Sequence, residues 1–131
     1  MELGDFKYGL VWMDAQHSKF IEWFNKLYAA CEEGKCALEI IQISKFIECY
    51  ILDHFLIEES YMNKYNYPNF EQHKREHLKF TSDYKKFTET SLKKGNVVGD
   101  ELLEIMADYI MKNITHEDQK LAKFLRRKGV K

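Results

Sequence analysis

The stretch FEQHKREHLKFTSDYKKF, residues 70–87, decides the fold because it repeats with the period of an α-helix. Its apolar and histidine positions lie three or four residues apart throughout: Phe70, His73, His77, Phe80, Tyr84 and Phe87. Residues at this spacing share one face of a helix, and charged residues fill most of the positions between them. The stretch therefore predicts an amphipathic helix whose buried face carries two histidines.

Three further segments show the same periodicity, so that four helices are expected at about residues 14–33, 37–65, 69–93 and 100–127. Asp14 is a plausible N-cap of the first helix, and Asn69 with Gln72 resembles a capping box at the start of the third. The connections are short and contain glycine, proline or asparagine. This pattern favours one all-α domain over residues 1–131, an antiparallel up-down-up-down four-helix bundle. The non-periodic residues 1–13 predict an N-terminal arm that packs against the bundle.

The composition is that of a helix-rich globular domain: 131 residues, 45% hydrophobic, with one proline. The net charge of -1 indicates no preference for nucleic acid or for an anionic membrane. No apolar run approaches the roughly 20 residues of a membrane span, and no signal peptide is evident. The three cysteines lack Cys-x-x-Cys spacing, so free thiols in a reducing cytoplasm are expected.

Ionisable residues fall on the apolar faces of the expected helices, where an unpaired charge would be costly. HFLIE places His54 and Glu58 four residues apart, and HKREH does the same for His73 and His77. Side chains at this spacing lie one turn apart on one helix face, within reach of one ion or of two neighbouring ions. His17 lies on the stripe of the first helix. Imidazole and carboxylate without thiolate favour iron, zinc or manganese, and bundle cores are where carboxylate-bridged di-iron sites occur.

Four stretches together resemble the hemerythrin family, specifically its single-domain bacterial and archaeal members. The matching stretches are MDAQH ending at His17, DHFLIEE at residues 53–59, YPNFEQHKREH at residues 67–77, and EDQKL around Asp118. They occur in the order of the family and at roughly its separations, so the resemblance covers nearly the whole chain.

The resemblance implies two iron ions in the bundle core, bridged by an oxo or hydroxo group and by two carboxylates. The ligands that match the motifs of the family are His17, His54, Glu58, His73, His77 and Asp118. The first two histidines would bind one iron, the last two would bind the other, and the two carboxylates would bridge them. The implied ligand is O2, which would bind reversibly at the iron with fewer ligands.

The segment NITHED departs from the pattern of the family, which has a histidine five residues before the bridging aspartate, where this chain has Asn113. On an ideal helix with Tyr109 set at 0°, Asn113 lies near 40°, His116 near -20° and Asp118 near 180°, at about 100° per residue. The apolar face is centred near 60°. His116 could replace the missing imidazole if the helix bulges. Alternatively Asn113 fills the space and leaves its iron short of a nitrogen ligand, or Glu117 replaces Asp118 as the carboxylate.

The expected function is therefore a non-enzymatic O2-binding carrier, store or sensor, with His116 as a further candidate ligand. The substitution at Asn113 keeps a second hypothesis open, a di-iron oxidase, peroxidase or nitric-oxide-handling protein. A metal-free or zinc-bound bundle that binds a partner is a third. No general acid or base stands apart from the proposed ligands, since Glu59 is expected at the surface and Tyr61, Tyr84 and Tyr109 in ordinary core positions.

Overall fold

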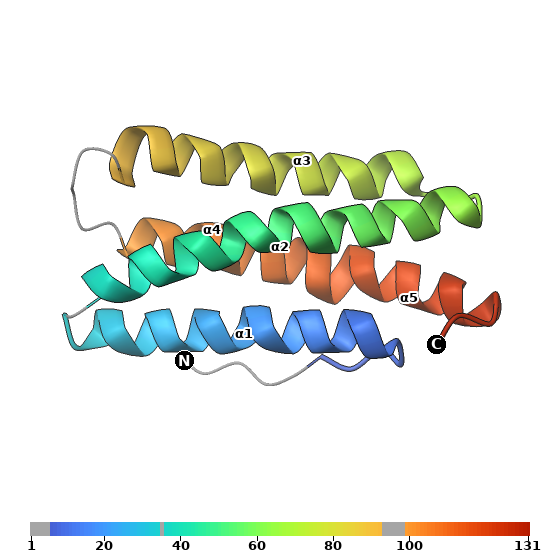
Figure 1. Cartoon of the computed structure of the whole chain (residues 1–131), viewed down its shortest axis with the longest axis horizontal. Coiled ribbons are helices and arrows are strands. Elements are labelled where there is room, and N and C mark those ends of the chain that lie inside the picture. Colours follow the sequence, from blue (N-terminus) through green and yellow to red (C-terminus); the bar gives the residue numbers. More distant parts are fainter. Residues whose placement is uncertain (1–5, 35, 93–98) are drawn as a thin grey trace.

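The computed structural model describes residues 6–34, 36–92 and 99–131, without the side chains of residues 91 and 92. Four antiparallel helical rods form a bundle, with the chain running up, down, up and down (Figure 1). The first three rods are α1 (Val11–Glu32), α2 (Ala37–Lys64) and α3 (Phe70–Phe87), the last extended by the π-helical turn η1 (Thr88–Leu92). The fourth rod is continuous through α4 (Gly99–Tyr109), the π-helical segment η2 (Ile110–Glu117) and α5 (Asp118–Arg127). The predicted all-α four-helix bundle is confirmed.

The N-terminal arm is fastened to the first turn of α1, which begins three residues earlier than the sequence predicted. Asp14 is not the N-cap. Its carboxylate instead accepts hydrogen bonds from the backbone N–H groups of Tyr8 (2.7 Å) and Gly9 (3.0 Å). Asn69 does stand at the N-cap position of α3, but its side chain makes no capping hydrogen bond. Residues 1–5 of the predicted arm, and the predicted end of the third helix at residue 93, lie outside the described residues.

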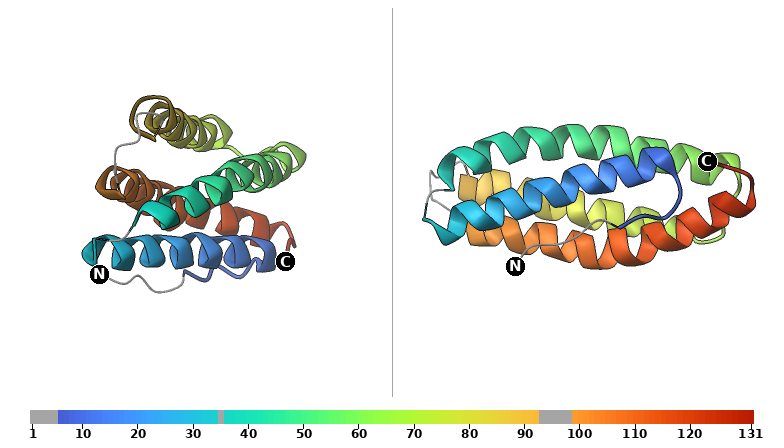
Figure 2. Two further views of the ribbon diagram at one scale, coloured as in Figure 1. Left: turned by 60° about the vertical axis from the view of Figure 1, so that its left-hand side comes forward. Right: turned by 90° about the horizontal axis from the view of Figure 1, so that it is seen from below.

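The core consists of two apolar clusters with a polar layer between them. One cluster, around Phe20 and Ile47, fills the end of the bundle where α1 meets α2. The other, around Met62 and Leu125, fills the opposite end. Along each rod the buried ionisable residues stand between the apolar residues of these two clusters. Figure 2 shows the four rods from two further sides. The ionisable residues of the polar layer are buried between these rods.

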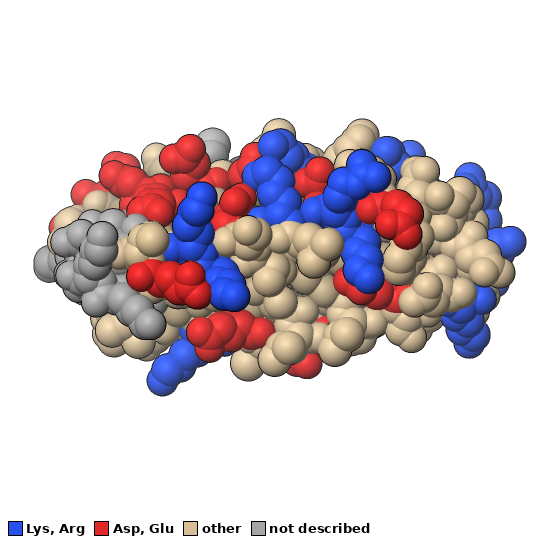
Figure 3. Space-filling model, turned by 90° about the horizontal axis from the view of Figure 1, so that it is seen from above, with Lys and Arg blue, Asp and Glu red and all other residues tan. Residues whose placement is uncertain are grey.

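The surface over α3 carries acidic and basic side chains interleaved along the bundle (Figure 3). Lys79, for example, bridges α3 and α4, with its Nζ 3.0 Å from Asp83 and 3.1 Å from Asp108. Such exposed ion pairs contribute little to stability. Within the described ranges, no helix combines the length and the apolar character that a bilayer crossing requires.

Candidate metal centre

All four rods contribute side chains to one buried cluster at the middle of the bundle. Its members are His17 on α1, His54 and Glu58 on α2, His73 and His77 on α3, and Asp118 at the start of α5. Each of these side chains is at most 2% exposed. The two pairs spaced four residues apart point inward because each follows the apolar stripe of its helix.

Glu58 lies between histidines of two helices. Its Oε2 is 3.0 Å from Nε2 of His54, on its own helix. Its Oε1 is 2.8 Å from Nε2 of His73 and 2.9 Å from Nε2 of His77, both on α3. The two carboxylate oxygens thus face different sets of imidazoles.

Asp118, like Glu58, lies between histidines of different helices. Its Oδ2 lies 2.7 Å from Nε2 of His17 and 3.6 Å from Nε2 of His54, while its Oδ1 lies 3.1 Å from Nε2 of His73. Two groups of four ligand atoms result, each with all atoms within 4.8 Å of one another, and both groups contain Glu58 and Asp118. Two cations that share two carboxylates fit this geometry.

The electrostatics of the cluster favour carboxylates that stay ionised. Burial lowers the pKa of His54 and of His73, but the neighbouring charges of Glu58 and Asp118 outweigh burial and raise the pKa values to about 9 and about 10. Burial raises the pKa of both acids, yet the surrounding histidines hold it well below its usual range. A buried pair of carboxylates needs such compensating positive charge.

The cluster also contains buried polar atoms without a hydrogen-bond partner among the described residues. They include Nε2 of His54, Oε2 of Glu58 and Oδ1 of Asp118, all directed at their neighbours in the cluster. Buried polar atoms are normally satisfied, so each exception needs an explanation. Neutral imidazole and ionised carboxylate are metal ligands, and a bound cation would occupy these atoms. The donor set therefore fits a pair of transition-metal ions.

Two side chains outside the ligand set orient the imidazoles. Nδ1–H of His54 donates to Oε1 of Gln16, and Nδ1–H of His77 donates to Oε2 of Glu59 at 3.1 Å. The expectation that Glu59 is a surface residue was wrong, since its side chain is only 23% exposed. Histidine ligands commonly donate their second ring N–H to such an acceptor. This rule could have identified Glu59 from the sequence, because Glu59 directly follows the candidate ligand Glu58 and is an acid that can accept such a hydrogen bond.

The structure does not bring His116 to the cluster, contrary to the prediction that it was a candidate ligand. Its side chain is 64% exposed, and its Nε2 lies 3.6 Å from Oε2 of Glu117. Glu117 is buried but belongs to neither group of ligand atoms, and its Oε2 lies 3.4 Å from Nζ of Lys120. The carboxylate that the fourth rod supplies is that of Asp118.

The π-helical segment η2 explains this outcome. The N–H of Asp118 donates to the carbonyl of Asn113, five residues earlier, instead of four as in an α-helix. A π-helical turn contains one more residue than an α-helical turn. Each residue after the turn therefore lies about 100° behind its position on an ideal α-helix. Asp118 then moves from about 180° to about 80°, close to the centre of the apolar face, and His116 moves from about -20° to about -120°, away from it. The bulge considered for His116 does occur, but it turns Asp118 inward.

Asn113 lies in the interior with the oxygen of its amide unsatisfied among the described residues. It is 1% exposed, and its Oδ1 has no hydrogen bond among the described residues. It lines a cavity of about 10 Å³ together with Glu76, Phe80 and Tyr109. This volume is near the lower limit for one water molecule, about 10–15 Å³.

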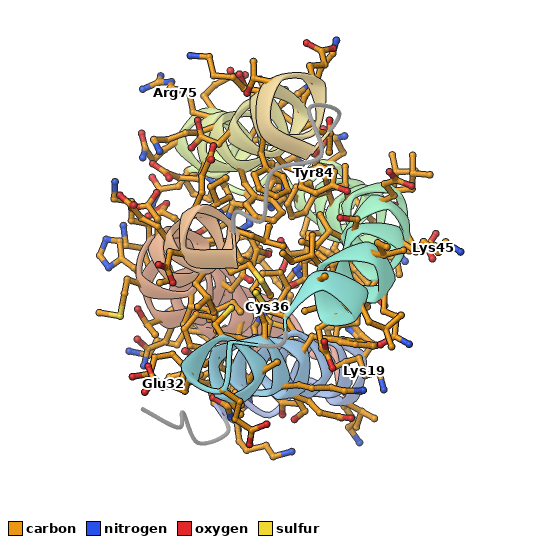
Figure 4. All side chains as sticks on the ribbon, turned by 90° about the vertical axis from the view of Figure 1, so that its left-hand side faces the viewer. Lys19, Glu32, Cys36, Lys45, Arg75 and Tyr84 are labelled. Atoms are coloured by element: carbon orange, nitrogen blue, oxygen red, sulfur yellow. The ribbon has the colours of Figure 1, made fainter. Side chains whose placement is uncertain are left out.

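Aromatic rings enclose the cluster. The Tyr50 ring stacks on His54 with centroids 4.6 Å apart, and Phe55 stacks on His77 at 3.9 Å. The hydroxyls of Tyr50 and Tyr109 are hydrogen-bonded to each other at 2.9 Å. The Tyr50 and Phe55 rings exclude water from one side of the cluster. Farther along α3, Tyr84 points inward, where its O–H donates to the backbone carbonyl of Ser44 (Figure 4).

Comparisons with known proteins agree with this site. The family model described as the hemerythrin HHE cation binding domain matches residues 9–125. A bacteriohemerythrin of Pseudomonas aeruginosa is 29% identical over 117 residues, which cover 87% of this chain and 73% of that protein. A bacteriohemerythrin of Campylobacter jejuni is 26% identical over 116 residues, covering 88% and 87%. A third, of Stenotrophomonas maltophilia, is 30% identical over 121 residues, covering 90% and 76%.

Proposed function

Because this chain belongs to the hemerythrin family, we propose that it is a non-haem di-iron protein that binds O2 reversibly as a carrier, store or sensor. The proposal is carried by one observation, the position of Glu58 and Asp118 between two sets of buried histidines. In this assignment His17 and His54 bind one iron. His73 and His77 would bind the other, and the two carboxylates, with an oxo or hydroxo group, would be shared by the pair.

The residues around the proposed centre have defined roles. When bound, a reduced iron pair would supply the electrons that reversible O2 binding requires. The chain holds the imidazoles in one tautomer, since Gln16 and Glu59 accept the Nδ1–H of His54 and His77 and leave Nε2 free for the metal. Tyr50 and Phe55 cover the imidazoles and keep the site dry. Exclusion of water protects a reactive centre from side reactions.

Metal analysis and absorption spectra test the assignment. Iron-supplied protein should contain about two iron ions per chain, and its reduced form should change colour in air and revert under vacuum. His54→Ala and His77→Ala should lose iron, because each removes a ligand from a different group. His116→Ala is the matched control, an exposed histidine whose removal should leave the iron content unchanged. An iron-free wild-type protein, or full iron content in both ligand variants, would refute the assignment.

A second candidate function is a di-iron oxidase, peroxidase or nitric-oxide-handling protein. Asn113 favours it, because a buried amide in place of a third imidazole leaves the iron of His73 and His77 with fewer nitrogen ligands. The two candidates differ in stoichiometry. A carrier binds O2 once and releases it, whereas an oxidase continues to consume O2 as long as an external reductant is present. An oxygen electrode distinguishes them.

We propose a cytoplasmic location on the basis of cysteine usage. Cys31, Cys36 and Cys49 are all unpaired in the structure. Free thiols are typical of proteins kept in a reducing compartment.

A further inference from the structure

Two cysteines lie close together at the end of the bundle where α1 is connected to α2. Cys31 lies in the last turn of α1, and Cys36 is the N-cap residue of α2. Cys36 is buried and Cys31 is partly buried. Figure 4 looks at this end of the bundle and shows Cys36 directed into the space between the helices.

Gly99, at the start of α4, leaves room for both sulfurs. A β-carbon at this glycine would lie under 3.0 Å from Sγ of Cys31 and from Sγ of Cys36. Both sulfurs therefore occupy the place of the missing side chain and are close neighbours. The Cys36 thiol is also close enough to the Cys31 thiol to raise its pKa. The spacing of the cysteines in CEEGKC, with four residues between them, gave no indication of a redox pair. Only the fold, which joins α1 to α2 at this point, brings the thiols together.

We propose that Cys31 and Cys36 form a dithiol site that is converted to an intramolecular disulfide by exchange with a small disulfide such as oxidised glutathione. The site is separate from the proposed metal centre, because Cys31 follows His17 by 14 positions, or roughly 20 Å along α1. It is a covalent modification site at the α1–α2 connection.

The reaction balances without any further reagent. One of the two thiols, as its thiolate, attacks oxidised glutathione, which forms a mixed disulfide and releases one glutathione thiolate. The second thiolate then attacks the protein sulfur of the mixed disulfide, which forms the Cys31–Cys36 bond and releases the second glutathione. The two protons of the protein thiols pass to the two leaving thiolates. Two protein thiols are oxidised and one glutathione disulfide is reduced.

The surroundings make this exchange slow at neutral pH. Burial raises the pKa of the Cys31 thiol to about 12, and the neighbouring Cys36, Asp100 and Glu39 add to the increase. Since the thiolate is the attacking species, the fully protonated thiol reacts slowly. Conversion is therefore expected over hours, and the disulfide should be reversed by dithiothreitol.

Peptide mapping of the iron-loaded, full-length protein tests the proposal. The Cys49→Ser variant is used, because it removes the exposed third thiol and leaves the pair intact. It is equilibrated in buffers of rising oxidised-to-reduced glutathione ratio, alkylated and digested with trypsin, which cleaves after Lys35, between the two cysteines. The expected product at high ratios is the peptide of residues 27–35 linked to that of residues 36–45, in most chains.

Variants that lack one partner provide the controls. In the same background, Cys31→Ser and Cys36→Ser should give no linked peptide and should instead carry a single glutathione on the remaining thiol. The proposal is overturned if, at the most oxidising ratio, both cysteines of the intact pair remain alkylated or each carries its own glutathione. Iron content plays no part in this readout, so failure here leaves the proposed di-iron function untouched.

Discussion

Asn113 stands where the hemerythrin pattern has a histidine, and its environment limits what can replace it. Its amide is buried beside Phe80 and Tyr109, in contact with a cavity that has room for about one water molecule. His116 cannot compensate, since its side chain points to solvent. In the proposed centre the chain would therefore offer no third imidazole to the iron of His73 and His77, and water or an anion could take that place.

Asn113→His should make the proposed oxygenated protein last longer. A third imidazole would take the remaining place at the iron of His73 and His77 and suppress the one-electron transfer to O2 that ends reversible binding. We therefore expect a several-fold longer half-life of the oxygenated form. The measurement is the decay of its visible absorption band at fixed temperature and pH. Asn113→Ala, which leaves the position open, is the control and should give no extension. An unchanged half-life in the histidine variant would show that the residue has no role in oxygen retention.

The sequence could predict the helices but not the π-helical segment η2. The stripes of buried residues recur every three or four positions in α1, α2 and α3, so these rods and their inward histidines followed from periodicity alone. Asp118 did not, because an ideal helix turns it away from the core, and only the resemblance to the family pointed to it. A π-helical bulge depends on packing around the helix and carries no periodic signal of its own.

Among the described residues, one hydrogen bond joins the N-terminal arm to η2. The Tyr8 hydroxyl donates to the backbone carbonyl of Ile114 at 2.7 Å, within the π-helical segment. The same ring lies edge-on to His17, with centroids 5.7 Å apart. The arm thus contacts both the ligand on α1 and the segment that turns Asp118 inward.

Tyr8→Phe should destabilise the protein without emptying the centre. The loss of one partly buried hydrogen bond costs about 1 kcal/mol of unfolding free energy, which corresponds to a decrease in Tm of roughly 4 °C. Iron content should stay the same, because Asp118 is also held by three histidines. Tyr65→Phe, at a half-buried ring that stacks on Tyr61, is the matched control for thermal unfolding followed by circular dichroism. A Tm equal to that of the wild type would mean that the arm contributes nothing to η2.

In the molecule as a whole, a buried layer of ionisable residues lies next to a core rich in aromatic side chains. Burial raises the pKa of the five tyrosines that pack in or beside this core: Tyr8, Tyr50, Tyr67, Tyr84 and Tyr109. For Tyr8 and Tyr67 the pKa rises to about 12, and for the hydrogen-bonded pair Tyr50 and Tyr109 it rises well above 10. The folded state therefore favours neutral phenols.

This preference predicts the sign of the alkaline response. A phenol whose pKa is higher in the folded than in the unfolded chain stabilises the fold fully below about pH 10, and the contribution is lost as the pH rises through the folded pKa. Part of the tyrosinate absorbance at 295 nm should therefore appear only when the helical circular dichroism is lost. The Tyr50–Tyr109 pair supplies this late part, because its pKa lies well above 10 in the folded chain. In Tyr109→Phe the late part should shrink by one phenol. Titration of every tyrosine near pH 10 with unchanged helicity would contradict the burial of this pair and, with it, the dry aromatic cover over His54.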